Sequence, residues 1–112
     1  MSDLEFAKMH GAGNDFIMID DMSCVFDEAP GLISALCETH RGVGADGIII
    51  LRPADGADFE MRYYNSDGSR AEMCGNGARC AAKFALERGI AAGNMTFSTG
   101  AGPVSAEVLG DL

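Results

Sequence analysis

Basic residues are scarce in this chain of 112 residues, and long apolar stretches are missing. Eight lysines and arginines stand against 17 acidic residues, which gives a formal net charge of −9. This charge disfavours nucleic acid and anionic membrane surfaces as partners. No apolar run approaches the roughly 20 residues of a bilayer-spanning helix, and the acidic start at residues 1–5 is unlike a secretory signal. We therefore expect a cytoplasmic protein with no nucleic-acid or membrane partner.

The cysteines lack the spacing of a metal site. Cys24, Cys37, Cys74 and Cys80 contain no pair with the C-x-x-C spacing typical of zinc ligands, and the two histidines are isolated. Without a secretory signal, disulfide bonds are the weaker interpretation. We predict free thiols and no metal site, with Cys24, Cys37 and Cys80 serving as packing residues.

The spacing of apolar residues predicts a single α/β domain of the α+β type, because runs of period two alternate with helical runs. Strands are expected over residues 4–9, 16–20, 48–51, 58–64, 95–99 and 104–109, and helices over 30–39 and 76–88. Residues 65–68 have the composition of a turn, and Gly89 suits the position just after a helix. Two helices packed on a mixed, largely antiparallel sheet, or on a partly closed barrel, is the natural arrangement.

The strongest chemical signal is a cysteine directly before a predicted helix. Cys74 is followed by Gly75, Asn76 and Gly77, in the region where a helix leaves main-chain N–H groups unpaired. Such a helix start stabilises a thiolate and also binds carboxylates. A reactive thiol beside an anion-binding loop suits chemistry at the α-carbon of an amino acid. The alternative is a capped turn followed by a packing cysteine.

Two further glycine-rich loops, at residues 11–15 and 42–47, do not match nucleotide-binding motifs. No Lys-Ser or Lys-Thr follows either loop, and neither has the G-x-G-x-x-G spacing that opens a helix. Asn14 and Asn65 each lie where a strand meets a turn. There, an asparagine either forms the turn or offers its amide to a polar ligand.

Three segments together resemble one known family. They are Lys-Met-His-Gly-Ala-Gly-Asn-Asp-Phe at 8–16, Arg-Gly-Val-Gly-Ala-Asp-Gly at 41–47, and residues 65–80, which contain Cys-Gly-Asn-Gly-Ala-Arg-Cys. In this order, and over essentially the whole chain, they are similar to diaminopimelate epimerase. The resemblance implies interconversion of LL- and meso-diaminopimelate, for lysine and peptidoglycan synthesis, by two cysteines and without a cofactor.

The resemblance also implies roles for individual residues. Cys74 would be one of the two catalytic bases, while Gly75 and Asn76 would hold the α-carboxylate of the amino-acid substrate through their main-chain amides. Asn14 and Asn65 would contact the polar ends of the substrate. The family fold consists of two pseudo-symmetric halves, each of which contributes one cysteine from a helix start.

The resemblance covers only one of these halves. Residues 1–112 correspond to the N-terminal half-domain, and the half-domain that would supply the second cysteine and a Glu-Arg pair is absent from this sequence. Glu87 and Arg88 end the first-half helix and do not replace that pair. Other interpretations are an inactive or binding-only fragment, a homodimer with two Cys74 thiols across one cleft, or a proline racemase-like enzyme. Phenazine-pathway isomerase-like proteins share the fold class but lack the cysteine.

Overall fold

A single mixed sheet forms the framework of the chain. The computed structural model describes residues 6–11, 13–26, 28, 30–38, 44–71 and 75–108. Within them the elements are β1 (Phe6–Gly11), β2 (Asn14–Asp20), α1 (Pro30–Cys37), β3 (Gly47–Arg52), β4 (Phe59–Asn65), β5 (Arg70–Ala71), α2 (Gly75–Glu87), β6 (Asn94–Thr99) and β7 (Gly102–Glu107). Within the described residues every expected strand and both expected helices are confirmed, with ends that differ by one or two residues, whereas the expected positions 4, 5, 39 and 109 lie outside these residues.

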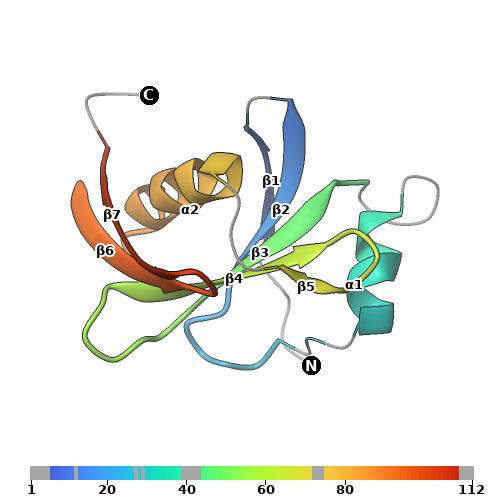
Figure 1. Ribbon diagram of the computed structural model, residues 1–112, viewed down its shortest axis with the longest axis horizontal. Coiled ribbons are helices and arrows are strands. Elements are labelled where there is room, and N and C mark those ends of the chain that lie inside the picture. The colour runs from blue at the N-terminus through green and yellow to red at the C-terminus, as the bar shows by residue number, and fades with distance from the viewer. Residues whose placement is uncertain are drawn as a thin grey trace.

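The sheet has the strand order β1-β2-β3-β4-β6-β7, and the short strand β5 pairs with β4. The β2–β3 and β4–β6 pairs are parallel, and the other pairs are antiparallel. Figure 1 shows α2 lying between the β6–β7 hairpin and the β1–β2 hairpin, with the sheet curving beneath it. The expectation of a mixed, largely antiparallel sheet with two helices is therefore confirmed. Across the described residues the sheet stays open, with β1 and β7 at its edges.

The larger core cluster lies between α2 and one face of the sheet. Phe59 and Phe97 stack with their ring centroids 4.6 Å apart, and both are fully buried. Met61 packs in the same cluster, and Tyr63 lies against it. The alternation of β4 thus places its odd-numbered residues toward α2, as period-two spacing predicts. Cys80 is buried within this cluster and acts as a packing residue, as expected.

The smaller core cluster lies on the opposite face, under α1. Ile33 and Cys37 of α1 pack there with Ile48 and Ile50 of β3 and with Tyr64 of β4. Because β3 has buried side chains on both faces, its sequence is a continuous apolar run instead of an alternating one. Leu36 packs against the same cluster, so Ile33, Leu36 and Cys37, at helical spacing, form the inward face of α1.

The end of α2 follows the pattern expected from Gly89. This residue has φ +73°, a left-handed conformation that glycine adopts without steric cost. The N–H of Ile90 donates to the carbonyl of Ala85 at 2.8 Å, and the N–H of Gly89 donates to that of Leu86 at 3.2 Å. These bonds satisfy carbonyls that the helix end would otherwise leave unpaired.

Two features differ from the sequence prediction. Strand β5 was not expected, because two residues are too few to show periodicity. The prediction that Cys24 is a packing residue is wrong, since its side chain is exposed. Cys24 lies in the turn after β2 and has φ +59°, so it falls beyond the strand, whose residues 16–19 are all buried.

Candidate active site

One end of the sheet brings together the segments that carry the sequence motifs. There, β2 and β3 begin and β4 ends, because β3 runs parallel to β2 and antiparallel to β4. Gly47 pairs with Phe16 of β2 on one side and with Asn65 of β4 on the other. Asn14, the first residue of β2, lies two positions before Phe16. Residues 14, 47 and 65 thus occupy the same edge of the sheet.

Asn14 also contacts the start of α2. The Nδ2 of Asn76, the second residue of the helix, donates to the Oδ1 of Asn14 at 3.1 Å, and the contact is partly buried. Figure 1 shows the first turn of α2 beside the β1–β2 hairpin. The fold therefore brings two of the predicted binding residues, 62 positions apart in the chain, into direct contact.

Gly75, the first residue of α2, is exposed, and a methyl group added to it would meet no described atom within 4 Å. The N–H groups of a first helical turn have no partner within the helix and carry a partial positive charge. This end of α2 can therefore accept an anion at close range. Residues 72–74 lie outside the described residues, so Cys74 is located only by its sequence position, directly before α2.

Asn65 lies at the same edge, but its side chain turns toward the β4–β5 hairpin. Its Nδ2 donates to the Oγ of Ser69 at 3.1 Å, and its carbonyl accepts from the N–H of Gly68 at 2.9 Å. Within the turn, hydrogen bonds from the hydroxyl and N–H of Ser69 lower the pKa of Asp67. Both of these contacts lie within the hairpin, so Asn65 acts here as a turn residue.

The two glycine-rich loops are joined by Asp15 and Asp46. The N–H of Asp15 donates to the Oδ2 of Asp46 at 2.8 Å, and the N–H of Asp46 donates to the carbonyl of Asp15 at 2.9 Å. The carboxylate of Asp15 also contacts the ring Nδ1 of His10 and lies 3.9 Å from the Nζ of Lys8. These contacts hold the chain on both sides of Asn14.

Gly47 is required for the close approach of β3 and β4 at this edge. A Cβ at this position would lie 2.6 Å from the carbonyl oxygen of Tyr64 and 2.8 Å from the Cε1 of Tyr63. Both distances are shorter than van der Waals contact allows. The glycine therefore lets the ring of Tyr63 lie against the start of β3.

A groove beside the site gathers positive charge in an otherwise acidic chain. It lies between β1 and α2, has a volume of about 510 Å³, and is lined in part by Lys8, His10, Arg79 and Lys83. Three of the eight lysines and arginines are thus found in one groove, with Glu87 as an acidic residue in its lining. Such a local field favours the approach of an anionic ligand to the first turn of α2, despite the net negative charge.

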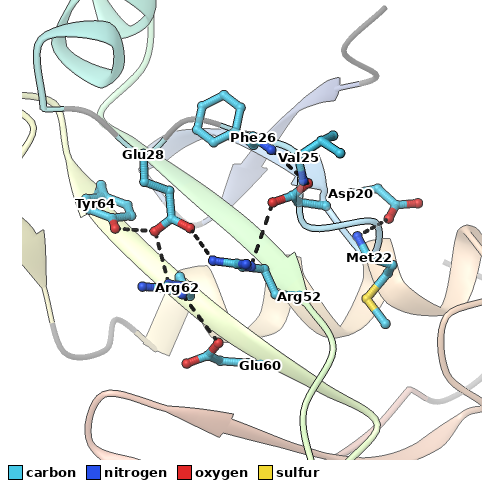
Figure 2. A network of polar contacts seen from close by, with 10 residues as sticks. Asp20, Met22, Val25, Phe26, Glu28, Arg52, Glu60, Arg62 and Tyr64 are labelled. Atoms are coloured by element: carbon cyan, nitrogen blue, oxygen red, sulfur yellow. Dashed lines mark hydrogen bonds and ion pairs between the residues drawn. The ribbon is translucent and has the colours of Figure 1, made fainter. Parts of the chain in front are cut away.

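A second polar cluster surrounds Glu28, on the face that carries α1. Figure 2 shows the Glu28 carboxylate between Tyr64, Arg62 and Arg52. The Nη1 of Arg52 donates to it at 2.9 Å, the Nε of Arg62 lies 3.0 Å away, and the Tyr64 hydroxyl donates a further hydrogen bond. Burial, and then the hydrogen bond to Glu28 and its charge, raise the pKa of Tyr64.

This cluster also reaches the buried Asp21. The Oδ1 of Asp21 accepts from the N–H groups of Val25 and Phe26 at 2.7 and 3.1 Å, and its Oδ2 lies 3.8 Å from the Nε of Arg52. These bonds shape the turn after β2. The cluster is therefore a structural network that joins this turn to the sheet.

Sequence reasoning missed Arg79 and Asp46, which contact residues of the candidate site. The Nη1 of Arg79 donates to the Oδ1 of Asn76 at 3.1 Å. A signal was available, because residues three apart on a helix lie on the same face. Asp46 had no such signal, since its partner lies 31 positions earlier in the chain.

The geometry places the chain in a fold class that known structures share. It superimposes on methylitaconate-delta-isomerase with a TM-score of 0.68 and 15% identity, covering 95% of this chain and 36% of that one. A Bacillus anthracis phenazine biosynthesis protein of the PhzF family gives a TM-score of 0.66 at 20% identity, covering 93% and 34% of the two chains. At these identities the likeness shows the fold alone.

Sequence comparison gives the family. The family model for diaminopimelate epimerase matches residues 6–111, so the chain belongs to the diaminopimelate epimerase family. The chain is 48% identical to the diaminopimelate epimerase of Brachyspira hyodysenteriae over 109 residues, which cover 95% of this chain and 39% of that protein. It is 44% identical to that of Archaeoglobus fulgidus over 108 residues, which cover 94% and 39%. The chain thus spans about two fifths of the length of these relatives.

Proposed function

We propose that this chain is the thiol-bearing half of an amino-acid epimerase that interconverts LL- and meso-diaminopimelate in the cytoplasm, for lysine and peptidoglycan synthesis. The observation that carries the proposal is the contact between Asn14 and Asn76. This contact joins the start of β2 to the first turn of α2, the helix that follows Cys74 in the sequence. The contact thus supports a site in which the candidate base directly precedes the helix that meets this polar edge.

In the proposed reaction, the Cys74 thiolate removes the proton from the α-carbon. An S–H bond forms as the C–H bond breaks, and the electron pair of that bond spreads into the carboxylate group. A thiol on the opposite face then donates a proton to the same carbon. The configuration inverts without net oxidation or reduction, so the step requires no redox cofactor and no imine.

The surroundings of α2 suit the charge that develops in this step. The main-chain amides of Gly75 and Asn76 would hold the α-carboxylate, where the helix start favours negative charge. Asn14 and Asn65 would contact the polar ends of the substrate, with Asn65 free to do so once its side chain leaves Ser69. The basic groove would guide the anionic groups of the substrate toward this end of the helix.

The second thiol must come from outside this chain's own site. A two-base reaction needs groups on both faces of the α-carbon, and the chain spans about two fifths of its relatives. The remaining part of a longer protein is the source that we propose. A second copy of the chain, with two Cys74 thiols facing one cleft, is the alternative source.

The test is the incorporation of deuterium at the α-carbon of LL-diaminopimelate in D₂O by the purified, reduced chain. We expect exchange without inversion, because Cys74 alone can remove the α-proton, exchange it with solvent and return deuterium. This exchange should be lost in Cys74→Ala and kept in Cys24→Ala, since the exposed Cys24 lies in the turn after β2, away from this edge. A parallel experiment measures the rate at which iodoacetamide alkylates Cys74, with and without LL-diaminopimelate.

Each outcome separates two functions. Protection of Cys74 without deuterium exchange would make the isolated chain a binding module that needs the second thiol for catalysis. Exchange of L-proline in place of LL-diaminopimelate would favour a proline racemase-like enzyme. Neither exchange nor protection in a folded sample would contradict the proposed function.

A further inference from the structure

Three side chains at the start of α2 form a directed relay of hydrogen bonds. The Nη1 of Arg79 donates to the Oδ1 of Asn76 at 3.1 Å, and the Nδ2 of Asn76 donates to the Oδ1 of Asn14 at 3.1 Å. Arg79 lies one helical turn after Asn76, so both project from the same face of α2. The relay ends at the first residue of β2, on the edge that forms the candidate site.

The chemistry of arginine sets the direction of the whole relay. A guanidinium group has N–H donors and no acceptor, so the atom of Asn76 that faces it must be the carbonyl oxygen. The NH₂ group of Asn76 then faces Asn14, and the atom of Asn14 that receives it must also be an oxygen. In an isolated asparagine the Oδ1 and Nδ2 atoms could exchange places at similar cost. In Asn76 the neighbouring guanidinium group fixes which atom faces it.

The NH₂ group of Asn14 is the end of the relay. Its side chain is half-buried, and the Nδ2 finds no hydrogen-bond partner among the described residues. A donor left without a partner in a partly buried site favours a ligand that brings an acceptor. The adjacent groove with Lys8, His10 and Lys83 adds donors and positive charge on the same side.

We propose that Arg79 is a positioning residue that holds Asn14 as a hydrogen-bond donor toward the ligand. The site then selects an acceptor group, a carboxylate of the substrate, over an ammonium group at this point. The identity of the ligand rests on the proposed function, whereas the orientation of the two amides does not. Arg79 acts through Asn76 and Asn14 and needs no contact with the reacting carbon.

Two asparagine-to-aspartate changes separate the links of the relay. Asn76→Asp keeps an acceptor for Arg79 but has no NH₂ group for Asn14, so the link to Asn14 is lost. Asn14→Asp still accepts from Asn76, so the relay remains while the donor toward the ligand disappears. Both changes preserve side-chain volume, so neither creates a cavity.

The first experiment follows the side-chain NH₂ signals of Asn14 and Asn76 in the ¹⁵N-labelled chain by NMR. In Arg79→Met we expect shifts of both signals and loss of the nuclear Overhauser contact between them, with partial recovery in Arg79→Lys, which restores a donor. Lys83→Met is the matched control, because Lys83 lines the same groove one helical turn further along α2. Asn76→Asp should move the Asn14 signal even if Arg79→Met proves poorly folded.

The second experiment measures the protection of Cys74 from iodoacetamide by LL-diaminopimelate. We expect the concentration for half-protection to rise about tenfold in Arg79→Met and in Asn14→Asp, as for one lost hydrogen bond to a charged group. Arg79→Lys should stay within about threefold of the wild type, because it restores a donor to Asn76.

Unchanged Asn14 and Asn76 signals in Arg79→Met, together with an unchanged Asn14 signal in Asn76→Asp, would overturn the proposal. Equal protection in Asn14→Asp and the wild type would overturn the assignment of Asn14 as a donor to the ligand. If the wild type shows the relay but no protection by LL-diaminopimelate, the proposed function fails while the positioning role of Arg79 stands.

Discussion

Asp46 and Asp15 exchange two hydrogen bonds, one through a side chain and one through the main chain, across 31 positions of sequence. The donor–acceptor distances are 2.8 and 2.9 Å. The pair joins the loops that begin β2 and β3, and it fixes the residue next to Asn14. The edge of the sheet that carries Asn14 is therefore shaped by a contact between two motifs, neither of which is informative alone.

Asp46→Ala should lower the free energy of unfolding by about 1 kcal/mol, because the N–H of Asp15 loses a charged acceptor at an exposed position. Urea unfolding gives this value, and hydrogen exchange should show faster exchange of the Asp15 amide. Asp46→Asn is the control, since its side-chain oxygen can still accept. Equal exchange rates in Asp46→Ala and the wild type would show that the main-chain bond alone holds the loops.

Gly47→Ala should destabilise the chain by about 1–3 kcal/mol, because the new methyl group overlaps the carbonyl of Tyr64 and the ring of Tyr63. Gly31→Ala is the matched control. Gly31 lies in α1, and a methyl group there meets no described atom within 4 Å. We therefore expect Gly31→Ala to raise the free energy of unfolding by up to about 1 kcal/mol. Denaturant midpoints of the two variants should shift in opposite directions, and shifts of the same sign would contradict the steric argument.

Glu28→Ala should cost about 2–3 kcal/mol, because Arg52 and Arg62 would lose their shared carboxylate. A fully buried pair loses roughly 3–5 kcal/mol, but both arginines here retain some access to water. Glu60→Ala, which removes a looser 3.8 Å contact with Arg62, should cost less than about 1 kcal/mol. Thermal unfolding followed by circular dichroism measures both, and equal losses would show that the Glu28 network adds no specific stability.

The raised pKa of Tyr64 predicts a loss of stability in alkali. Burial and Glu28 favour the protonated phenol in the folded state and so raise its pKa above the ordinary tyrosine value of about 10. The stability that this preference adds to the folded state is fully present below about pH 10. It is lost as the pH rises through the raised pKa of the folded state. The unfolding free energy should fall more steeply above about pH 10 in the wild type than in Tyr64→Phe. Urea titrations at a series of pH values test this, and parallel curves would contradict it.

The thiols should differ in reactivity according to burial. In a Cys74→Ser background, Cys24 should be alkylated first, since it is exposed, whereas Cys37 and Cys80 are buried. Burial, with a smaller effect of Asp46, also raises the pKa of Cys37 and so disfavours its thiolate. Mass spectrometry of the labelled peptides should give rates that are slower by a factor on the order of 100 or more at the two buried sites. Comparable alkylation rates at all three cysteines would contradict the burial of Cys37 in α1 and Cys80 in α2.

The sequence by itself determined the elements and their inward faces. The alternation of Phe59, Met61 and Tyr63 indicated which side of β4 is buried, and the helical spacing before Gly89 located α2 and its end. These properties depend on residues within one or two turns of each other, so local spacing is sufficient to predict them. The motifs around Asn14, Asn65 and Asn76 were likewise found from the sequence.

Only the tertiary structure decided how these residues meet. It joined Asn14 to Asn76, turned Asn65 toward Ser69, added Arg79 to the site and left Cys24 exposed. Each outcome depends on which strands pair and on which polar atoms lie within about 3 Å of one another. Local periodicity carries no such information, because side-chain partners 62 positions apart are set by the packing of α2 into the curved sheet.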